Sequence, residues 1–202
     1  SRLVGSEMCI RDRAKTNLPR WSGDLQTFND IFGTTNNPWD IDRVPGGSSG
    51  GAAAAVAAGL TAFEIGTDIG GSIRYPSSFC GVFGHKPSFG IVPSRGYLDH
   101  EFGGSNEADV NVVGPIARSA EDLEMLLNVM RRRDAALQAS LELAPPVLEQ
   151  TRIAVWFEDD FCPVERKALK VMEAAVARLQ DSGVKIFHDA KPDLDPEEAC
   201  LL

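Results

Sequence analysis

Two serines in glycine-rich settings carry most of the chemical information in this chain. Ser48 lies in Pro45-Gly46-Gly47-Ser48-Ser49-Gly50-Gly51, and Ser72 lies in Gly66-Thr67-Asp68-Ile69-Gly70-Gly71-Ser72. Because glycine has no Cβ, a substrate can approach the backbone closely at both positions. A hydroxyl in such a setting is suited to attack on a carbonyl carbon. The two runs therefore predict acyl-transfer chemistry.

The loop that leads to Ser72 could stabilise the charge that develops in such a reaction. Glycines at positions 70 and 71 allow the backbone to close around a carbonyl oxygen, so that several amide groups point at it. The N–H groups expected to form this oxyanion hole are those of Ile69, Gly70, Gly71 and Ser72.

Two other interpretations of the serines remain open. Ser48 or Ser49 could simply cap a helix that begins at Gly50. The run 46–50 also satisfies the G-x-S-x-G pattern of α/β-hydrolases, which needs a buried strand before the serine and a histidine base. The preceding segment is instead polar and contains two prolines, which disfavours a strand. The histidines that this alternative could use are His85, His100 and His188.

The elements that must position the serines follow an α/β pattern. Residues 50–60 are apolar around the whole circumference, and Gly59 is placed as a C-cap, which predicts a short buried helix. Thr61–Ile65 reads as a short strand that leads into the loop 66–72. We therefore expect Ser72 to lie just beyond the end of a strand.

Further along the chain, two more patterns predict regular structure. Ser119 caps an expected helix whose apolar residues reach Met130 and which ends among the arginines at 131–133. A polar connection covers 134–150. A β-α-β unit follows, with strands at 153–156 and 184–187 and a helix opened by Pro163 and ended by Gly183. A right-handed crossover would make these strands parallel neighbours.

Composition excludes several classes of protein. The chain of 202 residues is 43% hydrophobic and 24% charged, which is typical of a globular protein. A formal net charge of −9 argues against nucleic acid as the main partner. No apolar run is long enough to cross a membrane, and the four scattered cysteines show no metal-ligand or disulfide spacing. We expect a cytoplasmic protein without a metal site.

The chain resembles the amidase signature family, the serine hydrolases that use a Ser-Ser-Lys triad. The resemblance covers nearly everything after Arg13 and is most specific between Gly46 and Pro87, where two Gly-Ser elements flank an Ala-rich helix. The motifs that carry it are Lys15-Thr16-Asn17-Leu18-Pro19, Phe32-Gly33-Thr34-Thr35-Asn36-Asn37-Pro38-Trp39, the run from Gly46 to Gly90, and Gly114-Pro115-Ile116-Ala117-Arg118-Ser119-Ala120-Glu121-Asp122.

The resemblance implies a fold and a set of roles. The fold is α/β: part of an amidase signature fold, with a mixed β-sheet core flanked by helices. Ser72 would be the nucleophile, and Ser48, preceded by a cis Gly47–Ser48 peptide, would relay its proton toward a lysine. No metal or organic cofactor is implied. The residues expected around these two are Asp68, Arg74 and Ser49 as supports of the loops, and Trp21 and Ser22 near the entrance for substrate.

The lysine of the triad has no counterpart in the resemblance. Lys15 belongs to the Lys-Thr-Asn element and Lys86 to a Gly-His-Lys-Pro turn, and neither matches the family's position for the base. We therefore expect an internal fragment that is inactive by itself. Its residues 1–13 would be a non-native segment, and its residues 14–202 a partial amidase signature domain truncated at both ends.

The expected function of the parent protein is hydrolysis of the C–N bond of small, non-peptide linear amides, with a homodimer possible. One alternative is the A subunit of a tRNA-dependent amidotransferase, which releases ammonia from glutamine for a partner protein. It ranks lower because residues 91–202 look more like free-standing amidases. Another alternative is a scaffold of the same fold without catalytic activity.

Overall fold

The computed structural model describes residues 15–94, 110–132, 147–188, 190–193, 195 and 197. The expectation for residues 1–13 lies outside these, as do His100 and most of the connection expected at 134–150. The chain divides into two compact units, Ser1–Ala139 and Ser140–Leu202. Each unit is considered by itself.

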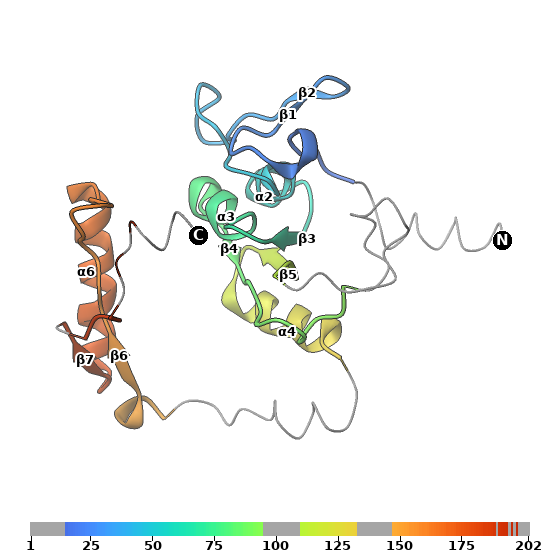
Figure 1. Ribbon diagram of the computed structural model, residues 1–202. Coiled ribbons are helices and arrows are strands. Elements are labelled where there is room, and N and C mark those ends of the chain that lie inside the picture. The colour runs from blue at the N-terminus through green and yellow to red at the C-terminus, as the bar shows by residue number, and fades with distance from the viewer. Residues whose placement is uncertain are drawn as a thin grey trace. The chain divides into compact units, whose positions relative to one another are not determined.

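A three-stranded antiparallel sheet forms the centre of the first unit, in the order β3-β5-β4 (Figure 1). Its strands are β3 (Phe63–Asp68), β4 (Phe83–Gly84) and β5 (Val112–Ala117). The pairing of β3 with β5 runs from Phe63↔Ala117 to Asp68↔Val112. Residues far apart in sequence are thereby brought side by side where β3 ends and β5 begins.

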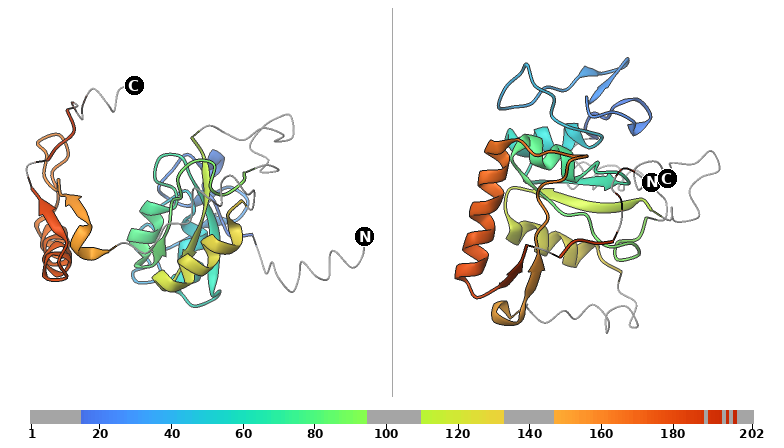
Figure 2. Two further views of the ribbon diagram at one scale, coloured as in Figure 1. Left: turned by 90° about the horizontal axis from the view of Figure 1, so that it is seen from below. Right: turned by 60° about the vertical axis from the view of Figure 1, so that its left-hand side comes forward.

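Helices cover both faces of this sheet. They are α2 (Gly50–Ala57), α3 (Arg74–Cys80) and α4 (Ala120–Met130). Figures 1 and 2 show α2 and α3 on one face and α4 on the other. Ala52 and Val56 of α2 pack with Ile73 and Ile116 in one buried cluster. The core thus fixes α2, which follows Ser48, against the loop that carries Ser72.

Helix α2 follows the sequence expectation closely. It is buried from Gly50 to Val56, and Gly59, at φ +72°, ends it in the left-handed conformation expected beyond a C-cap. It stops at Ala57 rather than at Leu60, whose side chain is exposed. Gly51 has no room for a Cβ, because that atom would meet the backbone of Asn17. The helix therefore begins in close contact with the N-terminal segment.

Strand β3 is longer than expected. It begins at Phe63 and continues to Asp68, so three residues expected in the loop belong to the strand. The reason is β5, which pairs with every residue of β3 and which the sequence did not suggest as a strand. Ser72 still lies four residues beyond the strand, as expected.

A small N-terminal hairpin completes the first unit. Its strands are β1 (Phe28–Asn29) and β2 (Gly33–Thr34), preceded by the 3-10 turn η1 (Arg20–Ser22). Asn17 ties the hairpin to α2: its side chain donates to Gly33 O and Thr35 Oγ1, and its carbonyl accepts from Gly51 N. The segment before the turn is thus anchored at the beginning of α2.

The second unit is the expected β-α-β unit. It contains η2 (Leu148–Gln150), β6 (Arg152–Ala154), α6 (Arg166–Asp181) and β7 (Lys185–Phe187). Strands β6 and β7 are parallel, as predicted. The helix begins at Arg166 with Glu165 as its N-cap, so the expectation that Pro163 opens it is wrong by one turn. Gly183, at φ +94°, follows its end as expected.

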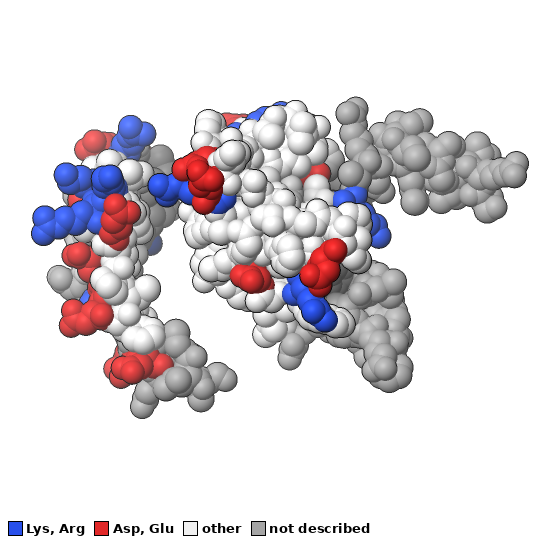
Figure 3. Space-filling view, turned by 90° about the horizontal axis from the view of Figure 1, so that it is seen from above, with Lys and Arg blue, Asp and Glu red and all other residues white. Residues whose placement is uncertain are grey.

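These elements confirm the α/β fold class. Parallel and antiparallel pairing both occur, in separate sheets. Among the described residues, no helix is long and apolar enough to cross a membrane. On the face shown in Figure 3, acidic and basic side chains are interspersed rather than gathered into one patch of either sign.

Candidate active site

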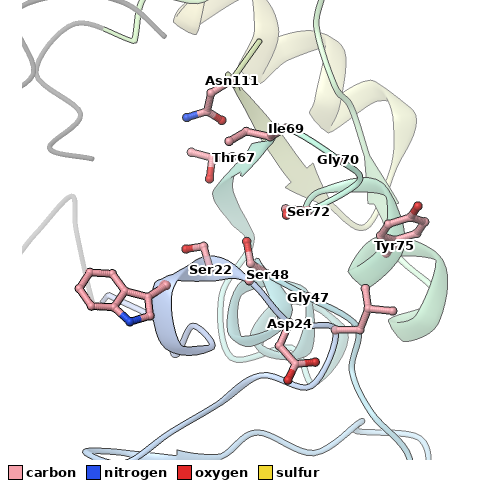
Figure 4. A pocket seen from close by; sticks show the side chains of 13 residues that line it. Ser22, Asp24, Gly47, Ser48, Thr67, Ile69, Gly70, Ser72, Tyr75 and Asn111 are labelled. Atoms are coloured by element: carbon pink, nitrogen blue, oxygen red, sulfur yellow. The ribbon is translucent and has the colours of Figure 1, made fainter. Parts of the chain in front are cut away.

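Both glycine-framed serines lie in one cavity of the first unit, with a volume of about 440 Å³ (Figure 4). The end of β3, the beginning of α2 and the N-terminal turn each contribute to its wall. The lining residues are Trp21, Ser22, Gly23, Asp24, Leu25, Gly47, Ser48, Thr67, Ile69, Gly70, Ser72, Tyr75 and Asn111. The residues that the sequence analysis singled out for catalysis and substrate entry therefore share one space.

Ser48 is held tightly at the beginning of α2. The peptide Gly47–Ser48 is cis, which confirms the expectation for this bond. Ser48 is only 3% exposed, and Gly47 has no room for a Cβ because the backbone of Asp24 lies against it. The buried hydroxyl of Ser48 is thus fixed on the wall of the cavity.

Ser49 joins the two serine loops. Its backbone N–H donates to Ser72 O at 3.1 Å. Its hydroxyl lies 3.4 Å from both the carbonyl oxygen and the amide nitrogen of Thr67, the penultimate residue of β3. Ser49 is buried, as expected of a supporting residue. It couples the position of Ser48 to that of Ser72.

Ser72 lies on the segment opposite Ser48. It precedes Ile73, the N-cap of α3, and is partly accessible in the cavity. Figure 4 shows the Ser48 and Ser72 side chains on facing segments, with Thr67 and Ile69 on the β3 side. This arrangement combines one accessible hydroxyl with one buried hydroxyl on the opposite segment.

Asp68 and Arg74 hold the loop between β3 and α3. Arg74 donates to both carboxylate oxygens of Asp68, from Nε to Oδ2 at 3.0 Å and from Nη2 to Oδ1 at 2.9 Å. The carboxylate also accepts from the backbone N–H groups of Gly71, Ile73 and Arg74. Burial raises the pKa of Asp68, but these hydrogen bonds outweigh it and lower the pKa to about 2. The loop is therefore organised around a permanent negative charge.

The geometry of this loop corrects one expected oxyanion donor. The N–H of Gly71 donates to Asp68 Oδ1 at 2.8 Å, so it points into the loop and not toward an incoming carbonyl oxygen. The ring of Tyr75 occupies the space where a Cβ of Gly71 would lie. At Gly70 the corresponding space is open. We therefore retain the N–H groups of Ile69, Gly70 and Ser72 as candidate donors and remove that of Gly71.

Trp21 and Ser22 line the cavity from the N-terminal turn, as the sequence analysis expected. Both have a positive φ, of 57° and 56°, which is uncommon for residues other than glycine. Trp21 is 89% exposed, so its ring is available at the edge of the cavity. The turn thus contributes an aromatic ring and a hydroxyl to the cavity wall.

Neither lysine of the described first unit lies in the cavity wall. Lys15 is exposed, and Lys86 donates from Nζ to Pro87 O at 3.0 Å.

The α/β-hydrolase alternative is wrong, because residues 35–47, all of them described, contain no strand before Ser48. His85, the histidine of the described first unit, does not line the cavity. Among the described residues, no three His, Cys, Asp or Glu side chains gather to hold a metal ion.

Four wall residues with polar side chains were not predicted from the sequence. They are Asp24, Thr67, Tyr75 and Asn111. Thr67 lies within the glycine-rich run of Ser72 and Tyr75 lies three residues beyond it, so proximity in sequence could have indicated them. No motif marks Asn111, which reaches the cavity only because β5 pairs with β3. Recognising β5 would have been needed to find it.

Comparison with known proteins gives a consistent result. A family model described as Amidase matches residues 13–201. The A subunit of the glutamyl-tRNA(Gln) amidotransferase from Caldanaerobacter subterraneus subsp. tengcongensis is 37% identical over 186 residues, which cover 88% of this chain and 37% of that protein.

Solved structures of similar proteins also match the chain. The crystal structure of the A subunit of the glutamyl-tRNA(Gln) amidotransferase from Thermotoga maritima matches with a TM-score of 0.69 and 32% identity, over 86% of this chain and 38% of that one. A bacterial aryl acylamidase of the amidase signature enzymes matches with a TM-score of 0.68 and 31% identity, over 85% of this chain and 36% of that one. The chain thus spans less than two fifths of the length of these proteins.

Proposed function

The chain belongs to the amidase signature family, and from that premise we propose that its protein cleaves the C–N bond of amides through an acyl-enzyme on Ser72. The observation that carries the proposal is the shared cavity, in which the accessible Ser72 faces the buried Ser48 after its cis peptide. A nucleophile, a candidate proton relay and free backbone donors are the parts that acyl transfer requires.

The first half of the reaction forms the acyl-enzyme. Ser72 Oγ attacks the carbonyl carbon and passes its proton to Ser48 Oγ, which gives its own proton to a base. The oxyanion accepts hydrogen bonds from the N–H groups of Ile69, Gly70 and Ser72, and one such donor is typically worth about 3 to 4 kcal/mol. The intermediate then collapses, the C–N bond breaks, and the nitrogen leaves as ammonia or an amine after it receives a proton through Ser48.

The second half restores the enzyme. Water attacks the ester carbon while the base, again through Ser48, takes a proton from the water. The C–O bond to Ser72 breaks, the carboxylic acid leaves, and Ser72 Oγ regains its proton. Asp68 takes no part in this proton transfer, since its low pKa keeps it ionised; it fixes the loop that carries the donors and the nucleophile.

We propose that the described residues of the first unit do not supply the base. The family resemblance implies a lysine, which must be neutral to accept the proton. Lys15 is exposed and Lys86 is directed at a neighbouring carbonyl, so we propose that neither acts as the base. The 202-residue chain by itself would then bind substrate without turning it over.

For the substrate we propose small linear amides. The second candidate is release of ammonia from glutamine as the A subunit of a tRNA-dependent amidotransferase, and one observation favours it. The Caldanaerobacter relative, which carries that name, matches 88% of the chain, so the resemblance of residues 91–202 to free-standing amidases is a weaker reason to rank it lower. Ammonia release that requires a co-purifying partner and ATP would favour this candidate.

The proposal is tested by labelling the whole protein with a fluorophosphonate, which reacts with activated serines. We expect one adduct, on Ser72, and amide hydrolysis that Ser72→Ala abolishes and Ser48→Ala lowers by at least about 100-fold, as expected when a proton-transfer group is lost. Ser78→Ala is the matched control, since this exposed serine of α3 lies outside the cavity wall. An adduct that persists in Ser72→Ala would overturn the assignment, and no adduct at all would favour an inactive scaffold.

A further inference from the structure

Asn111 is a buried polar residue of the cavity wall that no step of the proposed reaction uses. It is 4% exposed. Its Oδ1 has no hydrogen-bond partner in the part of the chain that the structure describes. Buried acceptors of this kind are uncommon in folded proteins, because an unmade hydrogen bond costs the full desolvation of the group. An orphaned acceptor in the wall of a cavity is accounted for when a bound ligand supplies the donor.

The position of Asn111 brings it close to the reacting group. Asp68 pairs with Val112, so Asn111 and Ile69 are the next residues beyond that pair on the two strands. Figure 4 shows the Asn111 carboxamide beside Thr67 and Ile69, at the end of the cavity formed by β3 and β5. Ile69 N–H is a candidate donor to the carbonyl oxygen. A group next to Ile69 therefore lies close to the atoms bonded to that carbonyl carbon.

The chemistry of the wall indicates which donor fits. Among the lining residues the one charged side chain is Asp24, so the cavity has no cation that would attract an anionic group. An amide substrate offers a neutral N–H on its reacting group, and an ester of the same acid does not. The side-chain amide of asparagine turns readily about χ2, which would direct Oδ1 toward the cavity when a donor is bound.

We propose that Asn111 is a specificity residue of this site, whose Oδ1 accepts a hydrogen bond from the N–H of the scissile amide and so favours amides over esters. The inference rests on the proposed function, because it takes Ser72 as the nucleophile. It names the substrate class as primary and secondary amides, which carry that N–H. Tertiary amides and esters lack the donor and would leave Oδ1 unpaired.

The test compares variants of the whole protein on p-nitrophenyl butyrate and butyryl p-nitroanilide, an ester and a secondary amide of one acid. Asn111→Leu keeps the branched skeleton of the side chain and removes the acceptor, whereas Asn111→Asp keeps an acceptor. We expect Asn111→Leu to lower kcat/KM for the amide by about 10- to 100-fold, the range of one lost hydrogen bond in a buried site. Its value for the ester should stay within about threefold. Asn111→Asp should recover most of the amide activity.

Two further measurements separate the possible failures. Asn128→Leu, at an exposed asparagine of α4, is the matched control and should change neither substrate. The rate of fluorophosphonate labelling reports on Ser72 itself. If Asn111→Leu lowered kcat/KM equally for both substrates and also slowed labelling, Asn111 would have a structural role. If it lowered kcat/KM for neither substrate, Asn111 would not contact the amide. Either result overturns the inference while the proposed function stands. Absence of labelling and of both hydrolyses in the parent would overturn the proposed function and this inference with it.

Discussion

At the level of single residues, Asp68 organises the loop that carries Ser72. One carboxylate accepts hydrogen bonds from three backbone N–H groups and from the Arg74 guanidinium. Its side chain is fully buried, whereas that of Arg74 is 53% exposed. Without the Asp68 carboxylate, water could still solvate the Arg74 guanidinium, but it could not reach the backbone N–H groups of the loop. The charge of Asp68 therefore stabilises the protein mainly through its hydrogen bonds to the loop backbone, and less through its ion pair with Arg74.

We expect Asp68→Asn to lower the free energy of unfolding by about 2 to 3 kcal/mol at pH 7, because the new amide NH₂ would face N–H donors. The difference should depend on pH. Since the folded-state pKa of Asp68, about 2, lies below its ordinary value, the charge stabilises the fold above about pH 4 and loses this effect as the pH falls toward 2. Urea denaturation between pH 7 and pH 2.5 would show the two proteins converging on acidification.

The control is Asp40→Asn, which removes an exposed ion pair with Arg43. Such pairs contribute about 0 to 1 kcal/mol, so its effect should be small. If Asp68→Asn were no more destabilising than Asp40→Asn, or if its effect did not diminish with acidification, the loop would not depend on the buried charge.

Site residues that lie within a motif could be predicted from the sequence. Ser48, Ser72, Asp68 and Arg74 lie together as expected, because the glycine-rich runs determine the local backbone. Prediction from the sequence failed for Gly71, whose N–H is directed at Asp68 by the turn itself. It could not find Asn111, since that residue reaches the cavity through strand pairing over about forty residues of sequence.

At the scale of elements, β5 shows why the sheet was only partly predictable. Pro115 lies in the central strand of the order β3-β5-β4, where proline argues against a strand. The structure tolerates it because β4 is only two residues long and its pairing with β5 ends at Gly84↔Ile116. The Pro115 carbonyl still accepts from His85 N at 3.0 Å. Because β4 is so short, the missing N–H of Pro115 costs the sheet little stability. The periodicity of the sequence cannot show that the neighbouring strand is short.

The beginning of α2 is the element on which the position of Ser48 depends most directly. A Cβ at Gly51 would overlap the backbone of Asn17, which cannot move as a flexible side chain would. We expect Gly51→Ala to destabilise the protein by about 1 to 3 kcal/mol, although alanine has the higher helix propensity, because overpacking at a buried contact dominates. Thermal unfolding measures this change.

Gly23→Ala provides the comparison, since its Cβ would meet only atoms at ordinary contact distances, 3.9 Å and beyond, at a negative φ of −106°. That variant should stay within about 0.5 kcal/mol of the parent. A stabilised Gly51→Ala would show that the N-terminal segment moves aside freely, and that the contact between Asn17 and α2 does not fix the beginning of the helix.

For the whole molecule, the decisive question is where the base comes from. The first unit brings together Ser72, the proposed nucleophile, the buried Ser48 and the proposed backbone donors, while the chain spans under two fifths of the length of the relatives that it matches. The lysines of the described first unit, Lys15 and Lys86, stand apart from the cavity wall. In the proposed reaction these parts would serve binding and charge stabilisation, and removal of the proton would need a further group.

We therefore expect the purified 202-residue chain to show no amide turnover above background and only slow fluorophosphonate labelling of Ser72, because its hydroxyl would remain protonated. Lys15→Ala and Lys86→Ala should leave the whole protein's kcat within about threefold, as expected for lysines outside the site. Both expectations are checked by measuring the rates of ammonia release and of labelling, on the 202-residue chain and on the whole protein. Turnover by the 202-residue chain that Lys15→Ala or Lys86→Ala abolishes would identify that lysine as the base. Turnover that survives both substitutions would instead place the proton acceptor elsewhere in these residues.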